Sequence, residues 1–469
     1  MIEDKFLPDG FKALIRSEMD EKTAEILFSA LGGEPETSLR INRRKTPEEL
    51  PYADMTRVPW CRSGFYLPQR PQFTRNPLLH AGAFYVQDAS SMVYEDIVAS
   101  LVGDSPVSAC DLCAAPGGKT TAILNALPDG SVMLANEFTP SRAGILKENL
   151  CKYGYPDIIV TNAATSRLAA MKERFDLVAV DAPCSGEGMM RKEEAARSQW
   201  SDGLIRQCAS LQREILEDAV EMLAPEGILI YSTCTFNTSE DEDNALWIAE
   251  TFGLEPVDTG LAGKEGILGP VKGELPCLRF LPGLTRGEGL FVSVFRKPES
   301  TVGSRSTSRL KKKGRTEGKD KVDSRIMAMA SSWIEGDFEI RNIDGRLLAL
   351  SPSTAALLDS LPKGIRIMSA GVEIGEIKGK DLIPAHPLAM STAMAHPFPE
   401  TELSEEEALI YLSKEAIALP PETPKGFVTA TYRGLPLGFL KNLGNRSNNL
   451  YPSDYRIRDS KIINKTCLK

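Results

Sequence analysis

The sequence predicts an α/β protein whose central part is a Rossmann-like, doubly wound core. Short apolar, β-branched runs alternate there with helical patterns of about 10 to 20 residues, which is typical of a parallel sheet with helices on both faces. Two of the runs, 177–180 and 228–231, are each followed directly by a loop that contains a cysteine. Because ligands bind at the carboxyl edge of such a sheet, these paired thiols indicate a reactive site. Two structural cysteines are the alternative, since free cysteine is often buried.

The predicted elements of the core follow one another in a regular order. A short helix ends near residue 101, and a strand over 107–113 leads into a glycine-containing turn and a helix that ends near residue 127. The remaining strands are predicted at 131–136, 158–161, 176–180, 227–231, 278–281 and 290–295, and the remaining helices at 141–151, 205–223 and 240–251.

Changes in composition divide the chain into five parts. Its 469 residues are enough for about three domains of ~150 residues each. Residues 1–75 combine a helical pattern over 11–31 with a strand at 38–42, which predicts a small α+β domain. The other parts are the core at 76–297, a basic flexible linker at 298–325, a small intermediate domain at 326–400 and a last small domain at 401–469.

Local charge favours a nucleic-acid partner more than the net charge of −9 does, because phosphate contacts need only a basic stripe. The predicted linker is one such stripe. The N-terminal domain interleaves aromatic residues with arginines, among them Trp60, Phe65, Tyr66, Arg40 and Arg62. Such residues can stack on bases and contact phosphates, and a small aromatic core with a charged rim is the alternative.

The composition excludes several other classes of protein. With 42% hydrophobic and 25% charged residues, the chain is an ordinary globular protein, and no apolar run approaches the roughly 20 residues of a membrane span. Its start has no basic segment leading into an apolar one, so we expect a cytoplasmic location. The nine cysteines are scattered and odd in number, which argues for a reducing compartment.

The sequence does not predict a metal site. Cys110 and Cys113 have the spacing of half a zinc site, but the sequence has no second pair of cysteines with this spacing to complete it. The three histidines, His80, His386 and His396, are too few and too far apart in the sequence to complete one. They also make a Cys-His or Ser-His mechanism improbable, so a reactive cysteine must be activated by other groups.

The turn after the first core strand predicts a nucleoside cofactor. It is glycine-rich but has neither of the two phosphate-binding spacings, which argues against NAD and ATP. Its small residues let a ligand approach the backbone at a helix N-terminus, and Glu137 ends the next strand, where an acid accepts hydrogen bonds from ribose hydroxyls. This combination fits S-adenosylmethionine. The residues of the turn are Cys113, Ala114, Ala115, Pro116, Gly117, Gly118 and Lys119.

Two thiols beside such a cofactor suggest methylation of a pyrimidine. Carbon 5 of cytosine is too weak a nucleophile to attack a methyl donor unless a thiolate first adds to carbon 6. A free thiol has a pKa near ~8.5, so it needs electropositive surroundings, for which Lys119 is a candidate. Asp181 is placed to act as an acid at the ring nitrogen. A second cysteine suits removal of the carbon-5 proton, and the residues alone leave open which cysteine attacks.

Three long motifs in this order resemble the Sun/Nop family of RNA cytosine-5 methyltransferases. They span 111–120, 181–188 and 231–235, and the continuation Gly188-Met189-Met190-Arg191-Lys192 is similar to the RsmF-type bacterial rRNA branch. The likeness takes in nearly the whole chain. It implies an S-adenosylmethionine-dependent methyltransferase core, an RsmF-type intermediate domain and a C-terminal PUA-like domain that binds RNA.

The resemblance also implies roles for individual residues. Cys234 would be the nucleophile and Cys184 the residue that helps to resolve the adduct, while Asp181 and Lys119 face the target base. The cofactor would be held by the turn 113–119, Glu137 and Asp181. Where the family often has an aspartate after the third strand, this chain has Asn162, which is our candidate for the adenine contact.

The leading hypothesis is methylation of carbon 5 of a cytidine in ribosomal RNA, most specifically 16S rRNA. We expect ribosomal RNA or a ribosomal subunit as the partner, with no membrane and no obligate protein partner. Transfer RNA is the alternative substrate. In a DNA cytosine-5 methyltransferase Cys184 would attack instead of Cys234, and the Asp181-Ala182-Pro183-Cys184 loop disfavours an amino-methyltransferase. A non-catalytic RNA-binding assembly factor is the alternative from a different class.

Overall fold

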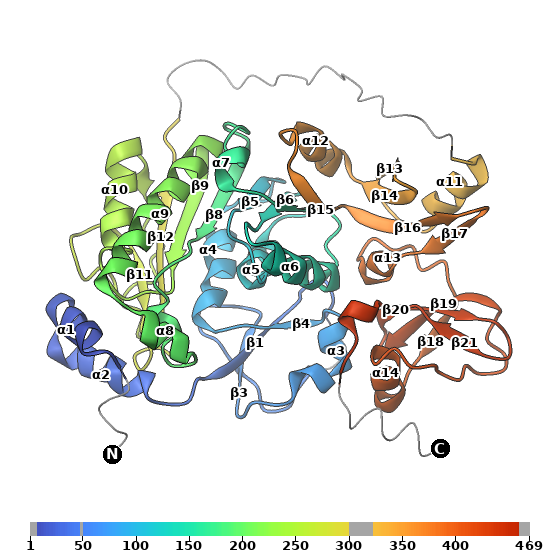
Figure 1. The fold of residues 1–469 in the computed structure, drawn as a ribbon, viewed down its shortest axis with the longest axis horizontal. Helices are drawn as coiled ribbons and strands as arrows, with labels where there is room; N and C mark the ends of the chain where they lie inside the picture. The colour runs from blue at the N-terminus through green and yellow to red at the C-terminus, as the bar shows by residue number, and fades with distance from the viewer. Residues whose placement is uncertain (1–6, 47–49, 300–321, 459–469) are drawn as a thin grey trace.

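The computed structural model describes residues 7–46, 50–299 and 322–458, and most of the predicted basic linker at 298–325 lies outside them. The core is a nine-stranded sheet with the strand order β10-β12-β9-β8-β5-β6-β7-β15, in which β11 also pairs with β12 (Figure 1). The strands β5 to β9 are parallel, and the others run antiparallel to their neighbours. Their bounds are β5 Ser108–Asp111, β6 Val132–Asn136, β7 Ile158–Asn162, β8 Phe175–Asp181, β9 Leu223–Thr233, β10 Glu255–Pro256, β11 Leu278–Phe280, β12 Leu290–Arg296 and β15 Arg366–Ala370.

The strand order reverses between β5 and β8, since the chain runs outward from β5 through β6 to β7 and then continues on the other side with β8 and β9. Ligands bind at such a switch point, in the crevice beyond the carboxyl ends of the strands. The loops that follow β5, β8 and β9 all begin at this carboxyl edge of the sheet. The predicted parallel sheet is therefore confirmed, and its topology puts the predicted site residues at one edge.

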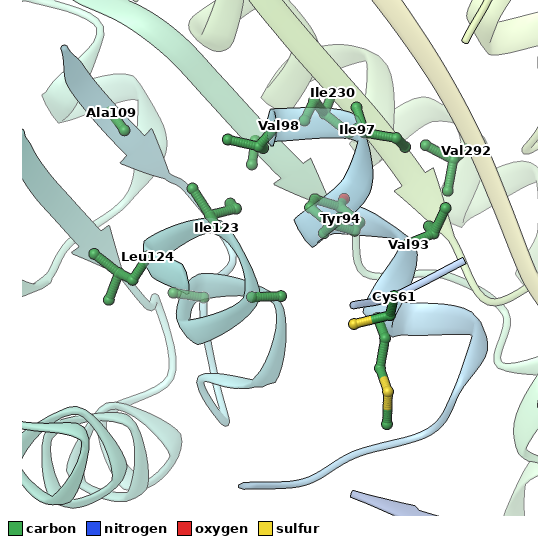
Figure 2. Close-up of a cluster of buried hydrophobic side chains, with 14 of the residues drawn as sticks. Cys61, Val93, Tyr94, Ile97, Val98, Ala109, Ile123, Leu124, Ile230 and Val292 are labelled. Atoms are coloured by element: carbon green, nitrogen blue, oxygen red, sulfur yellow. The ribbon is translucent and has the colours of Figure 1, made fainter. Parts of the chain in front are cut away.

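Helices cover both faces of the core sheet. On one face, Tyr94, Ile97 and Val98 of α4 and Ile123 and Leu124 of α5 pack against the strands (Figure 2). On the other face, α9 and α10 bury a second cluster together with α12. The helices of this region are η2 Ser90–Met92, α4 Val93–Leu101, α5 Gly118–Ala126, α6 Pro140–Tyr153, α7 Thr165–Leu168, η3 Glu187–Met189, α8 Glu194–Gln199, α9 Asp202–Met222, α10 Glu242–Phe252 and α12 Pro352–Ser360.

The N-terminal part has two helices and a four-stranded sheet of order β2-β3-β1-β4. The helical pattern over 11–31 is divided at Asp20, because this side chain accepts a hydrogen bond from the backbone N–H of Thr23 and so begins a second helix. The last strand, β4, comes from beyond residue 75. The elements are α1 Asp9–Glu18, α2 Glu21–Leu31, β1 Thr37–Ile41, β2 Thr56–Arg57, β3 Gly64–Leu67, η1 Phe73–Arg75, α3 Pro77–His80 and β4 Phe84–Val86.

The aromatic residues of this sheet form a core, so the interpretation of them as an RNA-stacking surface is wrong. Trp60 and Tyr66 are 4% and 2% exposed, and Arg40 is 1% exposed. Arg40 donates hydrogen bonds to Gln87 and Thr121 and thereby joins the N-terminal sheet to α5. Packing against α4 and α5 takes these side chains out of solvent, a contact between distant segments that local composition does not reveal.

The intermediate segment is built around a four-stranded sheet of order β13-β14-β16-β17. Its strand β15 leaves that sheet and pairs antiparallel with β7 of the core. An unpaired edge strand exposes a row of N–H and C=O groups, and β15 covers the edge that β7 would otherwise present. The elements are α11 Ser324–Ser331, β13 Glu339–Ile343, β14 Arg346–Leu350, β16 Val372–Lys378, β17 Asp381–Pro384 and α13 His386–Met390.

The C-terminal part is a small sheet of order β18-β19-β20-β21 with one α-helix. Its apolar residues share a cluster with those of the N-terminal sheet, so the C-terminal part packs against that sheet and helix α3 (Figure 1). Its elements are β18 Glu400–Glu402, α14 Glu405–Leu412, β19 Gly426–Tyr432, β20 Leu435–Asn442, β21 Ser447–Asn449 and η4 Ser453–Tyr455. Across the described ranges, no helix has the length and apolar character that crossing a membrane requires.

Candidate active site

The two cysteine-bearing loops lie side by side at the carboxyl edge of the core sheet. Asp181 at the end of β8 is in register with Ser232 near the end of β9. This pairing brings Cys184 and Cys234 together, with their Sγ atoms 3.2 Å apart. Both cysteines are free thiols and both are half-buried. Sheet register therefore creates a pair of thiols that a substrate can reach.

Hydrogen bonds join the two loops directly. The backbone N–H of Gly188 donates to the carbonyl of Cys234 at 2.7 Å. The Glu187 carboxylate accepts from the backbone N–H groups of Phe236 at 2.7 Å and Asn237 at 3.0 Å. A Cβ atom at position 188 would lie 2.5 Å from the Cys234 carbonyl oxygen, which explains the glycine. The first loop thus holds the backbone that carries the second thiol.

A fully buried carboxylate, Glu240, connects the two cysteine-bearing loops through hydrogen bonds. It accepts hydrogen bonds from the backbone N–H of Ser185 at 3.0 Å, from Gln212 Nε2 at 2.7 Å and from Asn237 Nδ2 at 2.9 Å. Buried carboxylates are stable only when such donors compensate for lost hydration. Glu240 therefore links the loop after β8, helix α9 and the loop after β9 into one unit.

Asp241 and Arg279 stabilise the second cysteine-bearing loop, which carries Cys234. Asp241 accepts hydrogen bonds from the hydroxyls of Thr233 and Thr235, the two neighbours of the nucleophile candidate. Arg279 lies 3.1 Å from Asp241 and also binds both oxygens of Glu242. The arginine and both carboxylates are at most 3% exposed. The backbone on either side of Cys234 therefore depends on a buried ion-pair cluster.

The two thiols have different electrostatic surroundings. A hydrogen bond to Cys234, burial, and the negative charges of Cys234 and Glu240 raise the pKa of Cys184 well above its ordinary value. Burial lowers the pKa of Lys119, but Asp181 and the charge of Cys234 outweigh burial and raise it. The surroundings therefore favour a protonated thiol at Cys184 and an ammonium group at Lys119.

Lys119 and Asp181 form an ion pair next to the thiols. Lys119 Nζ lies 2.9 Å from Asp181 Oδ2, and the two side chains are 15% and 31% exposed. The hydroxyl of Ser232 donates to the other carboxylate oxygen, Oδ1, at 2.7 Å. Asp181 is thus bound on both oxygens while part of its surface remains open toward the crevice.

The turn before α5 presents backbone to the same crevice. Gly117 has a φ of +111°, in the left-handed region that favours glycine, and it precedes the first residue of α5. The carbonyls of Ala115 and Pro116 accept hydrogen bonds from Arg142 at 2.7 Å and Asn149 at 2.8 Å. Helix α6 therefore holds this turn in place.

Glu137 and Asn162 lie at the ends of β6 and β7. Glu137 is 4% exposed, and its carboxylate accepts a hydrogen bond from the backbone N–H of Thr139 at 2.7 Å. Asn162 uses its Nδ2 group on the carbonyls of Glu137 and Phe138. The ring of Phe138 is 70% exposed at this edge. Asn162 therefore shapes the turn that presents Phe138, an aromatic residue that sequence reasoning missed.

The structure places the predicted residues in two groups. Lys119, Asp181, Cys184 and Cys234 form the first, and the turn 113–118 with Glu137 and Asn162 forms the second. Within the second group, burial and then the charges of Asp111, Asp181 and Glu137 raise the pKa of Cys113 well above its ordinary value. Over the described part of the chain, no three His, Cys, Asp or Glu side chains gather in a way that could hold a metal ion.

Sequence reasoning also missed the residues that hold the two loops. These are Glu187, Ser232, Glu240, Asp241 and Arg279. The acidic run 240–243 directly after the second cysteine loop was the available signal, because four acids in a row next to a buried strand need partners. Nothing in the sequence points to Arg279 as that partner.

Asp111, buried beneath the turn at the end of β5, leads to a prediction about stability. Its Oδ2 accepts a hydrogen bond from Thr120 at 2.7 Å, and its Oδ1 has no partner among the described residues. Burial, and then the charge of Asp181, raise the pKa of Asp111 from 3.8 to about 7. A carboxyl group with a raised pKa in the folded state stabilises the fold fully below pH 3.8 and loses that contribution as pH rises to about 7.

We therefore expect Asp111→Asn to flatten the dependence of the unfolding free energy on pH between about 4 and 7. The variant has one fewer group that binds a proton in the folded state over this range. The slope of the unfolding free energy against pH should therefore be smaller by up to about 1.4 kcal/mol per pH unit. Urea unfolding at several pH values measures the slope. Part of it remains in the variant, because burial also raises the pKa of Glu187 to about 7. Equal slopes in the variant and the original protein would contradict this account.

Three family comparisons match successive parts of the chain. Residues 7–89 match the N-terminal domain of 16S rRNA methyltransferase RsmF, residues 104–296 match the 16S rRNA methyltransferase RsmB/F family, and residues 398–457 match the methyltransferase RsmF PUA domain. Together these matches cover the N-terminal part, the core strands β5 to β12 and the C-terminal part.

Relatives of known name are similar over almost the full length. The ribosomal RNA small subunit methyltransferase F of Enterobacter sp. (strain 638) is 30% identical, with 97% of each chain covered. The protein of the same name from Escherichia coli O81 (strain ED1a) is also 30% identical, with 97% of this chain and 98% of the relative covered.

Solved structures from Pyrococcus horikoshii share the fold of the core. A methyltransferase homolog protein is 24% identical with a TM-score of 0.53, and the match covers 63% of this chain and 99% of that one. NSun6 with SFG is 17% identical with a TM-score of 0.51, and the match covers 62% of this chain and 99% of that one. At these identities the likeness concerns the fold alone.

Proposed function

We infer the reaction of this chain from the family to which it belongs, the RsmF-type 16S rRNA methyltransferases of the Sun/Nop group. This family methylates ribosomal RNA with S-adenosylmethionine. Our proposal is that the chain methylates carbon 5 of a cytidine in 16S rRNA through a covalent bond between Cys234 and carbon 6 of the base. The observation that carries it is the pair of thiols 3.2 Å apart beside the Lys119–Asp181 ion pair.

Electrostatics support Cys234 as the nucleophile. Asp181 and then Cys234 raise the pKa of Lys119 against the effect of burial, and we propose that this ammonium group stabilises the Cys234 thiolate. Before the addition, the Cys234 thiol gives its proton to Asp181. As the resulting thiolate adds to carbon 6, Asp181 passes this proton to N3 of the ring. The sulfur–carbon bond then makes carbon 5 nucleophilic enough to take a methyl group.

The change in charge at Cys234 supports Cys184 as the base of the second half-reaction. Two of the causes that raise the pKa of Cys184 are its hydrogen bond to Cys234 and the negative charge there. Once Cys234 is bonded to carbon 6, it is an uncharged thioether and both causes disappear. Cys184 then loses its own proton to solvent more readily, and its thiolate can take the proton of carbon 5. N3 returns its proton through Asp181 to Cys234, the double bond between carbons 5 and 6 re-forms, and the sulfur–carbon bond breaks to release Cys234 as a thiol.

The residues at the other end of the crevice fit S-adenosylmethionine, which supplies the methyl group as an activated sulfonium. Glu137 is a buried carboxylate at a strand end, suited to accept hydrogen bonds from ribose hydroxyls. The turn 113–118 offers a close backbone approach, and Asp181 lies between this turn and the thiols. The exposed ring of Phe138 is suited to pack against the adenine, beside Asn162.

Glu137→Ala is expected to weaken S-adenosylmethionine binding by about 10-fold to 100-fold, because charge-assisted hydrogen bonds to the ribose are lost. Isothermal titration calorimetry with the cofactor alone measures this. Glu221→Ala, which removes an exposed carboxylate outside the crevice, serves as the control and should bind normally. Unchanged affinity in Glu137→Ala would contradict the placement of the ribose, and no binding by the original protein would favour a non-catalytic assembly factor.

The parts of the chain around the core are proposed to bind RNA. We retain the division at 1–75, 76–297, 298–325, 326–400 and 401–469 as a proposal for their roles. The C-terminal segment matches a PUA domain, and its apolar residues share a cluster with those of the N-terminal sheet. Structured RNA is read through unstacked bases, and the target cytidine must leave its stack to reach Cys234.

Bisulfite sequencing of RNA from a deletion strain tests the proposed reaction. Loss of a protected cytidine in 16S rRNA, restored by the gene but not by a Cys234→Ala copy, is the expected result. Loss of protection in transfer RNA instead would make transfer RNA the substrate. If no protected cytidine changes in any RNA, carbon 5 of cytidine is not the site of methylation.

A further inference from the structure

We propose that Ser232 and Tyr94 are positioning residues that hold the Asp181 carboxylate in the orientation needed at the target base. The proposal rests on the proposed function, because it concerns how Asp181 meets the cytosine ring. Neither residue needs to touch substrate or cofactor. Both act through Asp181, and Tyr94 acts through Lys119 as well.

The contacts form a continuous chain. Tyr94 of α4 donates its hydroxyl proton to Ser232 Oγ at 2.8 Å, and Ser232 donates in turn to Asp181 Oδ1 at 2.7 Å. Lys119 Nζ binds the other oxygen, Oδ2, at 2.9 Å. Three elements of the core, α4, α5 and β9, therefore converge on a single carboxylate at the end of β8.

Tyr94 determines the direction of the Ser232 hydroxyl. A serine hydroxyl has one proton and accepts through its lone pairs. Because Tyr94 donates to this oxygen, the serine proton is directed at Asp181. Burial, followed by the nearby charge of Asp181, raises the pKa of Tyr94 well above its ordinary value, so Tyr94 keeps its proton and remains a donor.

Tyr94 also supports the second donor to Asp181. Lys119 Nζ lies 6.0 Å from the centre of the Tyr94 ring, at the outer limit of a cation–π contact. The ring itself is fully buried and packs in the cluster of α4, α5 and the core strands (Figure 2). One rigid side chain thus contacts both residues that bind the carboxylate.

This arrangement limits rotation of the carboxylate. Donors on opposite oxygens restrain the plane of the group, while its 31% exposed surface faces the crevice. Reaction rates depend strongly on such alignment, since a misplaced catalytic group loses much of its effect. Ser232 is fully buried, so its hydroxyl has no solvent to bind in place of Asp181.

Steady-state and single-turnover kinetics of Ser232→Ala test the proposal. We expect kcat to fall about 10-fold or more, as loss of a hydrogen bond to a charged group predicts, with KM for RNA and for S-adenosylmethionine within about twofold of the original. Tyr94→Phe should lower kcat less, by about threefold, because Ser232 remains. Ser232→Thr retains the hydroxyl and should restore most of the rate.

Two variants control for loss of buried hydroxyls in general. Ser293→Ala removes a buried serine of β12 that binds the carbonyl of Pro276, and Tyr155→Phe removes a buried tyrosine hydroxyl that binds the carbonyl of Ser131. Both should leave kcat unchanged. Melting temperatures of all variants show whether any has lost its fold.

The decisive comparison is made in an Asp181→Asn background. If Ser232 acts through Asp181, Ser232→Ala should have little further effect on the single-turnover rate there. An equal loss in both backgrounds, or full kcat in Ser232→Ala alone, would overturn the positioning role. Analysis of the product by mass spectrometry separates this outcome from failure of the proposed function. Absence of 5-methylcytidine with the original protein would refute the reaction itself, and its presence with a normal Ser232→Ala rate would refute only the positioning role.

Discussion

Cys234→Ala is expected to abolish both methylation and covalent capture of RNA that contains 5-fluorocytidine. Without a thiolate at carbon 6, carbon 5 remains too weak a nucleophile, so the rate should fall by at least about 10,000-fold, as when other enzymes lose their nucleophile. Capture appears on a denaturing gel as a protein band of reduced mobility. Removal of this thiol should also remove the charge that raises the pKa of Lys119.

Cys184→Ala is expected to give a different result on the same gel. Because Cys234 is intact, the bond to carbon 6 should still form, but the proton of carbon 5 is no longer removed. The variant should therefore turn over poorly and accumulate adduct even with unmodified RNA. Cys208→Ala, which removes a half-buried thiol outside the pair, should behave like the original protein. Capture by Cys234→Ala and none by Cys184→Ala would reverse the two roles and match the order expected for DNA cytosine-5 methyltransferases.

Arg279→Met is expected to lower the free energy of unfolding by about 3 to 5 kcal/mol, because it leaves two buried carboxylates without their cation. Asp241 and Glu242 are at most 3% exposed and cannot be rehydrated without opening the structure. Urea unfolding at neutral pH measures the change. Since Asp241 also binds the hydroxyls of Thr233 and Thr235, the thiol pair should lose alignment, and the rate of covalent capture should fall as well.

Arg341→Met is the matched control for this experiment. Arg341 also binds two carboxylates, Asp359 and Glu339, but all three side chains are at least 30% exposed. Exposed ion pairs contribute about 0 to 1 kcal/mol, so this variant should remain nearly as stable as the original. Equal losses in Arg279→Met and Arg341→Met would show that burial of the Arg279 cluster has no special importance.

The core sheet could be predicted from the sequence because its signals are local. Runs such as 177–180 and 228–231 are apolar on both faces, which is typical of strands buried between two layers of helices. The cofactor turn and the two cysteine loops follow directly from these strands. The helical pattern over 11–31 predicted one helix where the structure has two. The pattern is continuous, but the Asp20 side chain caps a new helix within it.

Contacts between distant segments were beyond local patterns. The pairing of β15 with β7 joins the intermediate segment to the core across about 200 residues of sequence. Arg40 looked like a phosphate ligand but binds Gln87 and Thr121 in a buried position. In each case the stabilising contacts are made with residues far away in the sequence. Periodicity within a short window does not detect such contacts.

By itself, the sequence determined that two thiols follow neighbouring strands and that an acid and a glycine turn stand near them, because strand ends and residue types are local properties. Only the tertiary structure decided that the two thiols lie together and that the Lys119–Asp181 ion pair forms at the same edge of the sheet. The register of β8 with β9 brings Cys184 and Cys234 to 3.2 Å, and the position of α5 brings Lys119 to Asp181. Electrostatic interactions depend on distance and burial, and these exist only once the chain has folded.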